Sequence, residues 1–376
     1  MIANRRNFLA GASLSAGIGA IPLAARTVAA APAAEASHFG PLTGQALLSR
    51  NENPYGPAPS AIEAISKTAR MGCYYADRGV GYLQDMIAER NGVSPKQVVL
   101  GSGSTEILCA IALAWGEKGA ILCPDLFWDT TVNYGERQGV KSIRVPLAAD
   151  MSVDLDAMAG AMSDDISLIQ ICNPNNPTGM LIDSAALRSF AAKVTPGATL
   201  LIDEAYNELT DTPDANSLVG LVRDGHDVII CRTFSKIYGM AGMRVGYAIT
   251  SEENADRIRG YLMSFGGNVA GIAGAIASYN DTAFIEQSKL MVTEGRAMIL
   301  DAVKTAGLTA LPSQTNFVYV KVPDADAVQA AMRERGIAIR GAYGPWAQYS
   351  RVSTGKMEDV VRYAKALPEI IGQLSG

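Results

Sequence analysis

The chain has 376 residues, of which 48% are hydrophobic, and its formal net charge is −5. That length is ample for a large core and predicts two domains. The mild acidity gives no electrostatic reason to bind nucleic acid or an anionic membrane. The only two histidines, His38 and His226, are too far apart in sequence to predict a histidine-rich metal site.

The first 36 residues are expected to be an export signal rather than part of the fold. Arg5-Arg6 precedes an uncharged stretch rich in Gly, Ala and Ser that runs from residue 8 to residue 25, and more small residues follow at 28–31. This arrangement is typical of a twin-arginine signal peptide and predicts a periplasmic protein. A transmembrane helix fits less well because the stretch is weakly apolar and contains Pro22. A chance arginine pair, and hence a cytoplasmic protein, is the other alternative.

Seven short apolar runs alternate with helical stretches between about residue 61 and residue 250. Runs that are apolar almost throughout are typical of strands covered on both faces. Helices between them imply crossover connections and a mostly parallel sheet, in which ligands bind at the carboxyl ends of the strands. The predicted strands are 98–100, 120–123, 143–145, 168–171, 200–202, 228–230 and 245–248.

The rest of the chain predicts a second, smaller α+β domain. Residues 41–59 hold too many Gly and Pro residues for a regular element and are expected to cross between the domains. The elements predicted after residue 250 are a helical region over 252–306 that breaks at Gly266-Gly267, a strand over 317–320, a helix over 324–335, short strands near Ile337 and Arg351, and a terminal helix. We expect an α/β protein with a large domain over 61–263 and a small domain formed by 37–60 and 264–376.

Two turns at predicted strand ends offer hydrogen-bond donors. Residues 101–106 (Gly-Ser-Gly-Ser-Thr-Glu) lie between a strand and an apolar helical run. Their backbone N–H groups and the helix N-terminus suit a phosphate, although an ordinary capped turn is the alternative. Residues 173–179 (Asn-Pro-Asn-Asn-Pro-Thr-Gly) follow the fourth strand, and the prolines and glycine hold Asn176 rigidly at the strand end. A rigid turn without a ligand is the alternative there.

Asp203 ends the predicted strand 200–202 and begins the motif Asp-Glu-Ala-Tyr. A carboxylate at the end of a buried strand requires a cationic partner, and a protonated pyridine nitrogen would serve. Such a charge pair makes a pyridine cofactor a stronger electron sink. Taken alone, the residue is more often a helix cap or a member of a surface salt bridge.

Lys236 follows the strand 228–230 in the segment Thr233-Phe234-Ser235-Lys236, and Arg244 comes eight residues later. The lysine amine can form a Schiff base with an aldehyde cofactor. The two hydroxyls and the guanidinium suit a phosphate on that cofactor. A lone lysine is ordinarily solvated, but four motifs on successive strand ends favour a cofactor site.

The motifs N-x-N-P-Y-G, G-S-G-S-T-E, N-P-N-N-P-T-G, D-E-A-Y, T-F-S-K and A-G-M-R-V-G together resemble the class I/II aminotransferases of pyridoxal phosphate (PLP) fold type I. The resemblance is greatest to the histidinol-phosphate aminotransferase branch and covers nearly the whole chain after residue 45. It implies a homodimeric PLP-dependent transaminase. Such an enzyme moves an amino group from an amino acid or a histidinol-phosphate-like donor to a 2-oxo acid.

The resemblance also implies roles for single residues. Lys236 is expected to form the Schiff base and to shuttle the proton, and Asp203 to pair with the pyridine nitrogen. Tyr206 and Asn176 are expected to bind the phenolic oxygen of the cofactor. The residues expected to hold its phosphate are Ser104, Thr105, Thr233, Ser235 and Arg244.

Two aromatic residues complete the implied cofactor site. Phe127 lies where the family stacks an aromatic side chain on the cofactor ring, and core packing is its alternative role. Tyr75 matches a tyrosine that reaches the cofactor phosphate of the neighbouring subunit, and an ordinary surface or core tyrosine is the alternative. If Tyr75 acts in this way, each site needs both subunits.

The donor is less well defined by the resemblance. Arg351 matches an arginine that binds the substrate carboxylate or a distal phosphate, and Arg340 matches a second anion-binding arginine of the histidinol-phosphate branch. A guanidinium suits either anion. Tyr55 and Asn316 are expected to complete the substrate wall.

Several alternatives stay open at this point. Tyr343 and Trp346 favour an aromatic or apolar donor side chain unless they only pack, and export separates the enzyme from cytoplasmic histidine biosynthesis. An aromatic amino acid aminotransferase is therefore the main alternative. The same fold and lysine serve PLP-dependent lyases, decarboxylases and racemases. A non-catalytic PLP-binding protein is the most distant alternative.

Overall fold

The computed structural model describes residues 38–375. The predicted signal peptide over 1–36 lies outside the described residues. The chain divides after Thr43, and the elements below belong to the compact unit that begins at Gly44. Among residues 38–375, none of the helices combines the length and the apolar character that a bilayer span requires.

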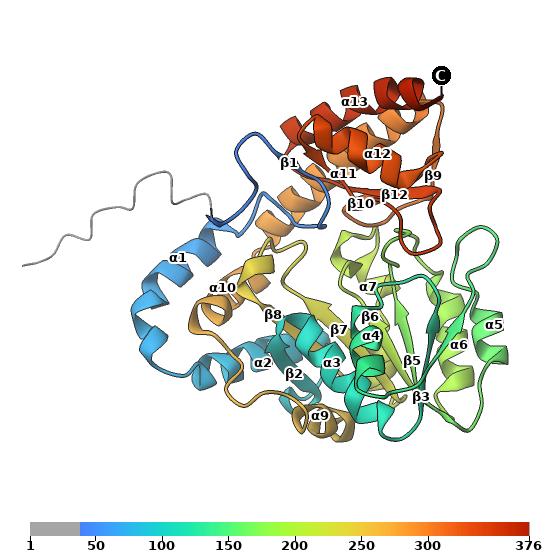
Figure 1. The fold of residues 1–376 in the computed structure, drawn as a ribbon. Helices are drawn as coiled ribbons and strands as arrows, with labels where there is room; N and C mark the ends of the chain where they lie inside the picture. Colours follow the sequence, from blue (N-terminus) through green and yellow to red (C-terminus); the bar gives the residue numbers. More distant parts are fainter. Residues whose placement is uncertain (1–37, 376) are drawn as a thin grey trace, which may run out of the picture. The chain divides into compact units, whose positions relative to one another are not determined.

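A seven-stranded sheet organises most of the chain up to residue 249 (Figure 1). Its strands follow the order β2-β8-β7-β6-β5-β3-β4. They are β2 (Val98–Ser102), β3 (Ala120–Pro124), β4 (Ser142–Val145), β5 (Ile166–Cys172), β6 (Thr199–Asp203), β7 (Val228–Thr233) and β8 (Val245–Ile249). Every predicted run is therefore a strand, and the predicted α/β fold with a mostly parallel seven-stranded sheet is confirmed.

Strand β8 is the exception to the parallel arrangement. It runs antiparallel to both of its neighbours, β2 and β7, whereas the other four pairs of strands are parallel. The connection between β7 and β8, residues 234–244, holds only a short 3-10 turn at Ala241–Met243. A parallel return needs a longer crossover, usually a helix. The same short connection carries Lys236.

Helices surround the sheet, and some of them begin at a residue whose side chain caps them. The helices of this part are α1 (Pro59–Thr68), α2 (Asp77–Asn91), α3 (Gly103–Gly116), α4 (Thr130–Arg137), α5 (Leu155–Gly160), α6 (Ser184–Val194), α7 (Pro213–Asn216), α8 (Val219–Arg223), α9 (Glu252–Arg259) and α10 (Val269–Tyr279). Asp183 and Ser251 accept backbone hydrogen bonds that start α6 and α9. Helix α3 is apolar almost throughout because it packs against several strands of the sheet.

The C-terminal elements gather around a smaller sheet, drawn in orange and red in Figure 1. Strands β12 (Tyr349–Ser353), β10 (Phe317–Lys321) and β9 (Thr309–Ala310) form it, and α11 (Thr282–Thr305), α12 (Ala325–Glu334) and α13 (Met357–Ser375) pack nearby. Their side chains form a hydrophobic cluster distinct from the one around the large sheet. The predicted boundaries, 61–263 against 37–60 with 264–376, stay a prediction.

The expectation that residues 41–59 hold no regular element is wrong. Strand β1 (Ala46–Leu47) pairs in parallel with β11 (Ile337–Ala338), and α1 already begins at Pro59. Proline is well tolerated at the first position of a helix. A two-residue strand has no pattern of its own, and it forms here because a distant segment supplies its partners.

Candidate active site

A cavity of about 670 Å³ lies at the carboxyl ends of β5, β6 and β7. It brings together most of the residues that the sequence singled out. Those in its lining are Ser104, Thr105, Phe127, Asn176, Asp203, Tyr206, Thr233, Ser235, Lys236, Arg244, Arg340 and Arg351. Side chains at strand ends of one sheet thus meet arginines from the C-terminal elements.

Three predicted residues are not brought to this lining. Tyr55 binds the start of α13, since its hydroxyl donates to the Gly355 carbonyl at 3.3 Å and accepts from the Met357 N–H at 3.0 Å. Asn316 is buried behind the cavity and donates to the Asn51 carbonyl at 2.9 Å. Tyr75 is 71% exposed and stacks on Phe265 with the ring centroids 4.5 Å apart.

One end of the cavity is a cradle of backbone and guanidinium donors at the N-terminus of α3. Gly103 has a φ of +76°, and a Cβ there would collide with the Arg244 guanidinium. A Cβ at Gly246 would likewise collide with the backbone of Ser104. Only glycine at both positions lets the arginine and the helix N-terminus approach one point, which is an arrangement that suits an anion.

The hydroxyl groups of this cradle are already linked to the arginine. Thr233 donates to the Ser235 hydroxyl at 2.9 Å, and Arg244 Nη1 donates to the same oxygen at 3.3 Å. Arg244 also donates to the Ala241 carbonyl at 2.9 Å and has a φ of +53°. Left-handed backbone is uncommon outside glycine and clusters at functional sites.

Lys236 and Asp203 both line the cavity, and burial shifts the pKa of each. Burial, followed by the charge of Arg351, lowers the pKa of Lys236 to about 8. Burial raises the pKa of Asp203 to about 6 despite the Ala205 N–H, which donates to its carboxylate at 3.1 Å. Among residues 38–375, Asp203 forms no ion pair within 4 Å. A buried carboxylate without a cation costs free energy. A cationic group of a ligand would therefore be stabilised beside Asp203.

Tyr206 and Asn176 belong to one hydrogen-bond network. The Tyr206 hydroxyl accepts from Asn51 Nδ2 at 3.0 Å and from Asn176 Nδ2 at 3.3 Å. Burial raises the pKa of Tyr206, so its hydroxyl keeps a proton to donate. Arg351 Nη1 in turn donates to Asn176 Oδ1 at 2.6 Å. The network fixes the positions of the phenol, the amide and the guanidinium relative to one another.

Arg351 is buried and only partly satisfied. It is 5% exposed, and its Nη2 donates to the Ser49 carbonyl at 2.8 Å. Its Nε is buried without a hydrogen-bond partner. Arg340 is exposed, and its backbone pairs with that of Arg351. The two guanidinium groups therefore line one side of the cavity, each with donors left for a ligand.

Sequence reasoning did not single out several residues of the lining. The chain after β1 contributes Ser49, Arg50, Asn51 and Glu52. Tyr343, which the sequence offered as a residue beside the donor side chain, also lines the cavity. The motif N-x-N-P-Y-G contains Asn51 and Glu52 and was the available signal. What it does not reveal is the φ of +57° at Asn51, which directs the next residue into the cavity.

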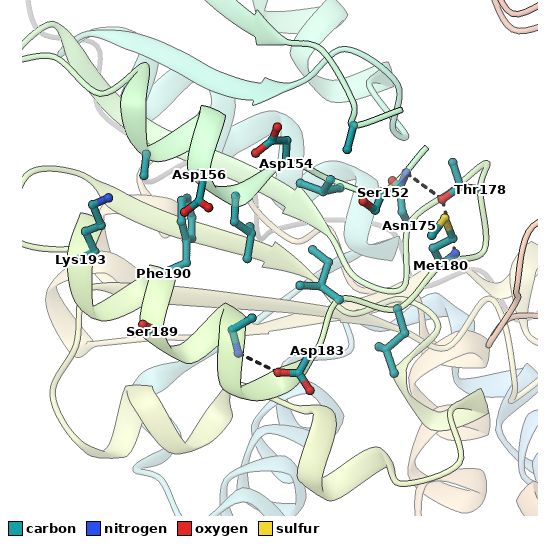
Figure 2. Close-up of a pocket in the computed structure, with 17 residues that line it drawn as sticks. Ser152, Asp154, Asp156, Asn175, Thr178, Met180, Asp183, Ser189, Phe190 and Lys193 are labelled. Carbon is teal, nitrogen blue, oxygen red and sulfur yellow. Dashed lines mark hydrogen bonds between the residues drawn. The ribbon is translucent and has the colours of Figure 1, made fainter. Parts of the chain in front are cut away.

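A second cavity, of about 580 Å³, lies beside α5 and α6 (Figure 2). Its side chains include Asp156, Asn175 and Lys193, and Asn175 Nδ2 donates to Thr178 Oγ1 at 3.2 Å within it. Asn175 and Thr178 belong to the 173–179 turn, but none of the residues expected to bind cofactor or substrate lines this cavity. We therefore take the first cavity as the candidate active site.

Comparison with known proteins agrees with this geometry. The family Aminotransferase class I and II matches residues 43–367. Histidinol-phosphate aminotransferase of Brevibacillus brevis is 34% identical over 338 residues, which cover 89% of this chain and 92% of that protein. Histidinol-phosphate aminotransferase 1 of Cupriavidus pinatubonensis is 35% identical, with 85% and 86% covered. The Sinorhizobium meliloti histidinol-phosphate aminotransferase, crystallised with pyridoxal-5′-phosphate, aligns with a TM-score of 0.81 at 32% identity and covers 87% of this chain and 91% of that chain.

The chain therefore belongs to the class I and II aminotransferases. It is a PLP-dependent transaminase, which uses an amino donor and a 2-oxo acid. The comparisons do not favour the alternatives, namely an aromatic amino acid aminotransferase, a PLP-dependent lyase, decarboxylase or racemase, or a non-catalytic PLP-binding protein.

The residues of the cavity fit this cofactor. The cradle at Gly103 offers the donors that a phosphate needs, and Asp203 offers an unpaired buried carboxylate to a pyridinium. Lys236 offers an amine whose pKa is low enough for a substantial neutral fraction at mildly alkaline pH.

Proposed function

We propose that the first cavity holds PLP through the residues expected from the sequence. Ser104, Thr105, Thr233, Ser235 and Arg244 would hold its phosphate, Asp203 its ring nitrogen, Tyr206 and Asn176 its phenolic oxygen, and Phe127 its ring face. We call this part of the cavity the cofactor end. Arg340, Arg351 and the residues around Glu52 and Tyr343 form the opposite part, which we call the donor end.

Bound PLP supplies an electron sink that stabilises negative charge on the substrate carbon next to the transferred nitrogen. The residues of the chain supply position and proton transfer. Lys236 Nζ takes up a proton and delivers it again, which its pKa near 8 suits because both protonation states are populated near neutral pH. Asp203 stays ionised above about pH 6. Arg351 orients the donor anion.

We propose that the amino donor is histidinol phosphate or another amine whose phosphate is held by two guanidinium groups. The observation that carries this proposal is that Arg340 and Arg351 both line the cavity. A monoamino monocarboxylic donor needs only one guanidinium. Curated relatives at 31% to 35% identity are named histidinol-phosphate aminotransferases, which supports the proposal.

A spectral half-reaction screen tests this function. Each donor is mixed with the purified holoenzyme without a 2-oxo acid, and conversion of the cofactor to its amino form is followed by absorbance. Histidinol phosphate is expected to convert the cofactor with a higher kcat/KM than histidine, phenylalanine, tyrosine or glutamate. Faster conversion by an aromatic amino acid would overturn the donor assignment but leave the transaminase intact.

We propose further that the enzyme is a homodimer with Tyr75 reaching the site of the neighbouring subunit. The support is a group of exposed apolar side chains in the segments around α2 and before α10. Its members are Met71, Tyr74, Tyr75, Tyr82, Met263 and Phe265, each more than half exposed. Exposed apolar groups in such number favour an interface.

Mixed dimers test this arrangement. Subunits carrying Lys236→Ala are refolded together with subunits carrying Tyr75→Ala, each of which is impaired by itself. If Tyr75 acts across the interface, one of the two sites in a mixed dimer has both residues intact, and activity recovers. If Tyr75 acts within its own subunit, mixing restores nothing, and the proposed arrangement fails.

We also propose export to the periplasm, on the basis of the Arg5-Arg6 segment alone. N-terminal sequencing of periplasmic material should find a chain that starts after residue 30. Replacing Arg5-Arg6 by two lysines should leave the protein in the cytoplasm. An intact Met1 on periplasmic protein would contradict the cleaved signal.

A further inference from the structure

Glu52 is the acidic group of the donor end that the proposed function leaves without a role. Its residue lines the cavity together with Lys236, Arg340 and Arg351. Among residues 38–375, its carboxylate has neither an ion pair within 4 Å nor a hydrogen bond. It is also one of the charges that act on Lys236, whose pKa it raises.

The other two carboxylates in the lining already have partners or an assignment. Asp129 is paired with Arg144 at 3.0 Å, and Asp203 lies at the cofactor end. The cationic side chains of the same lining are Arg50, Lys236, Arg244, Arg340 and Arg351. A free carboxylate among anion-binding arginines repels an anionic donor. That repulsion is offset only if the donor itself brings a cationic or N–H group to the carboxylate.

The backbone before Glu52 is held in a conformation that fixes this placement. Asn51 has a φ of +57°, a left-handed conformation that persists where the surrounding structure holds it in place. Its backbone N–H donates to Ser353 Oγ at 3.0 Å, and its Oδ1 accepts from the same hydroxyl at 2.6 Å. Its carbonyl accepts from Asn316 Nδ2 at 2.9 Å. Four hydrogen bonds, including the one to Tyr206, thus lock the residue that sets the direction of Glu52.

From this geometry we propose that Glu52 determines donor specificity by binding a nitrogen-bearing side-chain group of the amino donor, either an imidazole or an ammonium. The inference rests on the proposed function, because it assumes that donors bind at the donor end. It narrows the donor class to amines that carry both an anion for the arginines and a second nitrogen for Glu52. A hydrogen bond to a charged carboxylate gives the needed discrimination.

The test compares donors that differ only in that nitrogen. Histidine is paired with phenylalanine, and lysine with norleucine, and kcat/KM is measured for wild-type enzyme, Glu52→Gln and the control Asp129→Asn. Glu52→Gln is expected to lower kcat/KM for the nitrogen-bearing member of a pair about 10- to 100-fold more than for its partner. The imidazole pair and the ammonium pair show separately which nitrogen is bound. Asp129→Asn removes a carboxylate from the same lining and should affect both members of a pair alike.

A binding measurement without turnover completes the test. Calorimetry on the holoenzyme compares 3-(imidazol-4-yl)propionate with 3-phenylpropionate, neither of which has an amine to transfer. Glu52→Gln should weaken the binding of the imidazole compound selectively. Equal losses for both members of every pair, or no loss, would overturn the role of Glu52. A wild-type enzyme that transaminates these pairs but not histidinol phosphate would overturn the proposed donor and leave the role of Glu52 standing.

Discussion

The two ends of the cavity are built in different ways. The cofactor end comes from turns at the ends of β2, β5, β6 and β7 in one sheet, and each turn is a contiguous motif. The donor end comes from residues 49–52, 340–343 and 351, which lie near the N-terminus and the C-terminus of the fold. The sheet fixes the cofactor end, whereas long-range contacts assemble the donor end. Substitutions should therefore separate cofactor binding from donor recognition.

The largest effect is expected at the centre of the cofactor end. Lys236→Ala removes both the amine that bonds to the cofactor and the group that carries the proton. Turnover should fall by at least about 10²–10⁴, the range for general acid–base catalysis alone. Borohydride treatment followed by mass spectrometry should attach the cofactor to wild-type protein and not to the variant. Lys193→Ala, at the second cavity (Figure 2), serves as control, and normal turnover by Lys236→Ala would refute the mechanism.

The next largest effect is expected for Asp203→Asn, which removes the charge of the side chain without changing its size. Removing one member of a buried charge pair costs about 2–5 kcal/mol, or roughly 30-fold or more in affinity. Fluorescence titration of the apoenzyme should show this loss in the Kd for PLP. Asp129→Asn, whose native carboxylate pairs with Arg144, should bind PLP normally. Unchanged affinity in Asp203→Asn would mean that the carboxylate does not face the ring nitrogen.

The contrast between the two ends also explains what could be predicted from sequence. The seven strands and the polar turns at their ends follow from local patterns, because buried parallel strands are apolar runs and their ends collect polar turns. The family resemblance carried by those turns implied the individual lining residues of the cofactor end. Glu52 was missed because its role depends on the left-handed backbone at Asn51 and on Ser353 and Asn316, hundreds of residues away. The two-residue strand β1 was missed for the same reason. Tyr55 and Asn316 lie in the same region, yet they support the wall from behind rather than line it.

At the donor end, Arg351→Lys should weaken donor binding and spare the cofactor. Arg351 donates from Nη1 to Asn176 and from Nη2 to Ser49, and each of these nitrogens has a second N–H for the donor. A lysine ammonium keeps the charge but cannot reproduce that planar arrangement. Loss of one charged hydrogen bond is worth about 1.5–3 kcal/mol, so the KM for the donor should rise about tenfold or more. Arg335→Lys serves as the control, because Arg335 pairs with Glu369 and does not line the cavity. A larger change in the Kd for PLP than in the donor KM would contradict the separation of the two ends.

The smallest expected effect tests whether the two ends are electrostatically coupled. Arg351 lowers the pKa of Lys236, whereas Asp203 and Glu52 raise it, and with burial the result is about 8. The amine reacts only when neutral, so covalent capture of PLP by the apoenzyme should rise with pH and level off above about pH 8. Between pH 7 and pH 9 the neutral fraction, and with it the rate, should grow about tenfold, whereas an ordinary lysine near 10.4 would keep rising. Glu52→Gln removes a negative charge of the donor end and should move the midpoint to lower pH. An unmoved midpoint would mean that solvent screens the donor end from Lys236, and that the two ends communicate only through the bound donor.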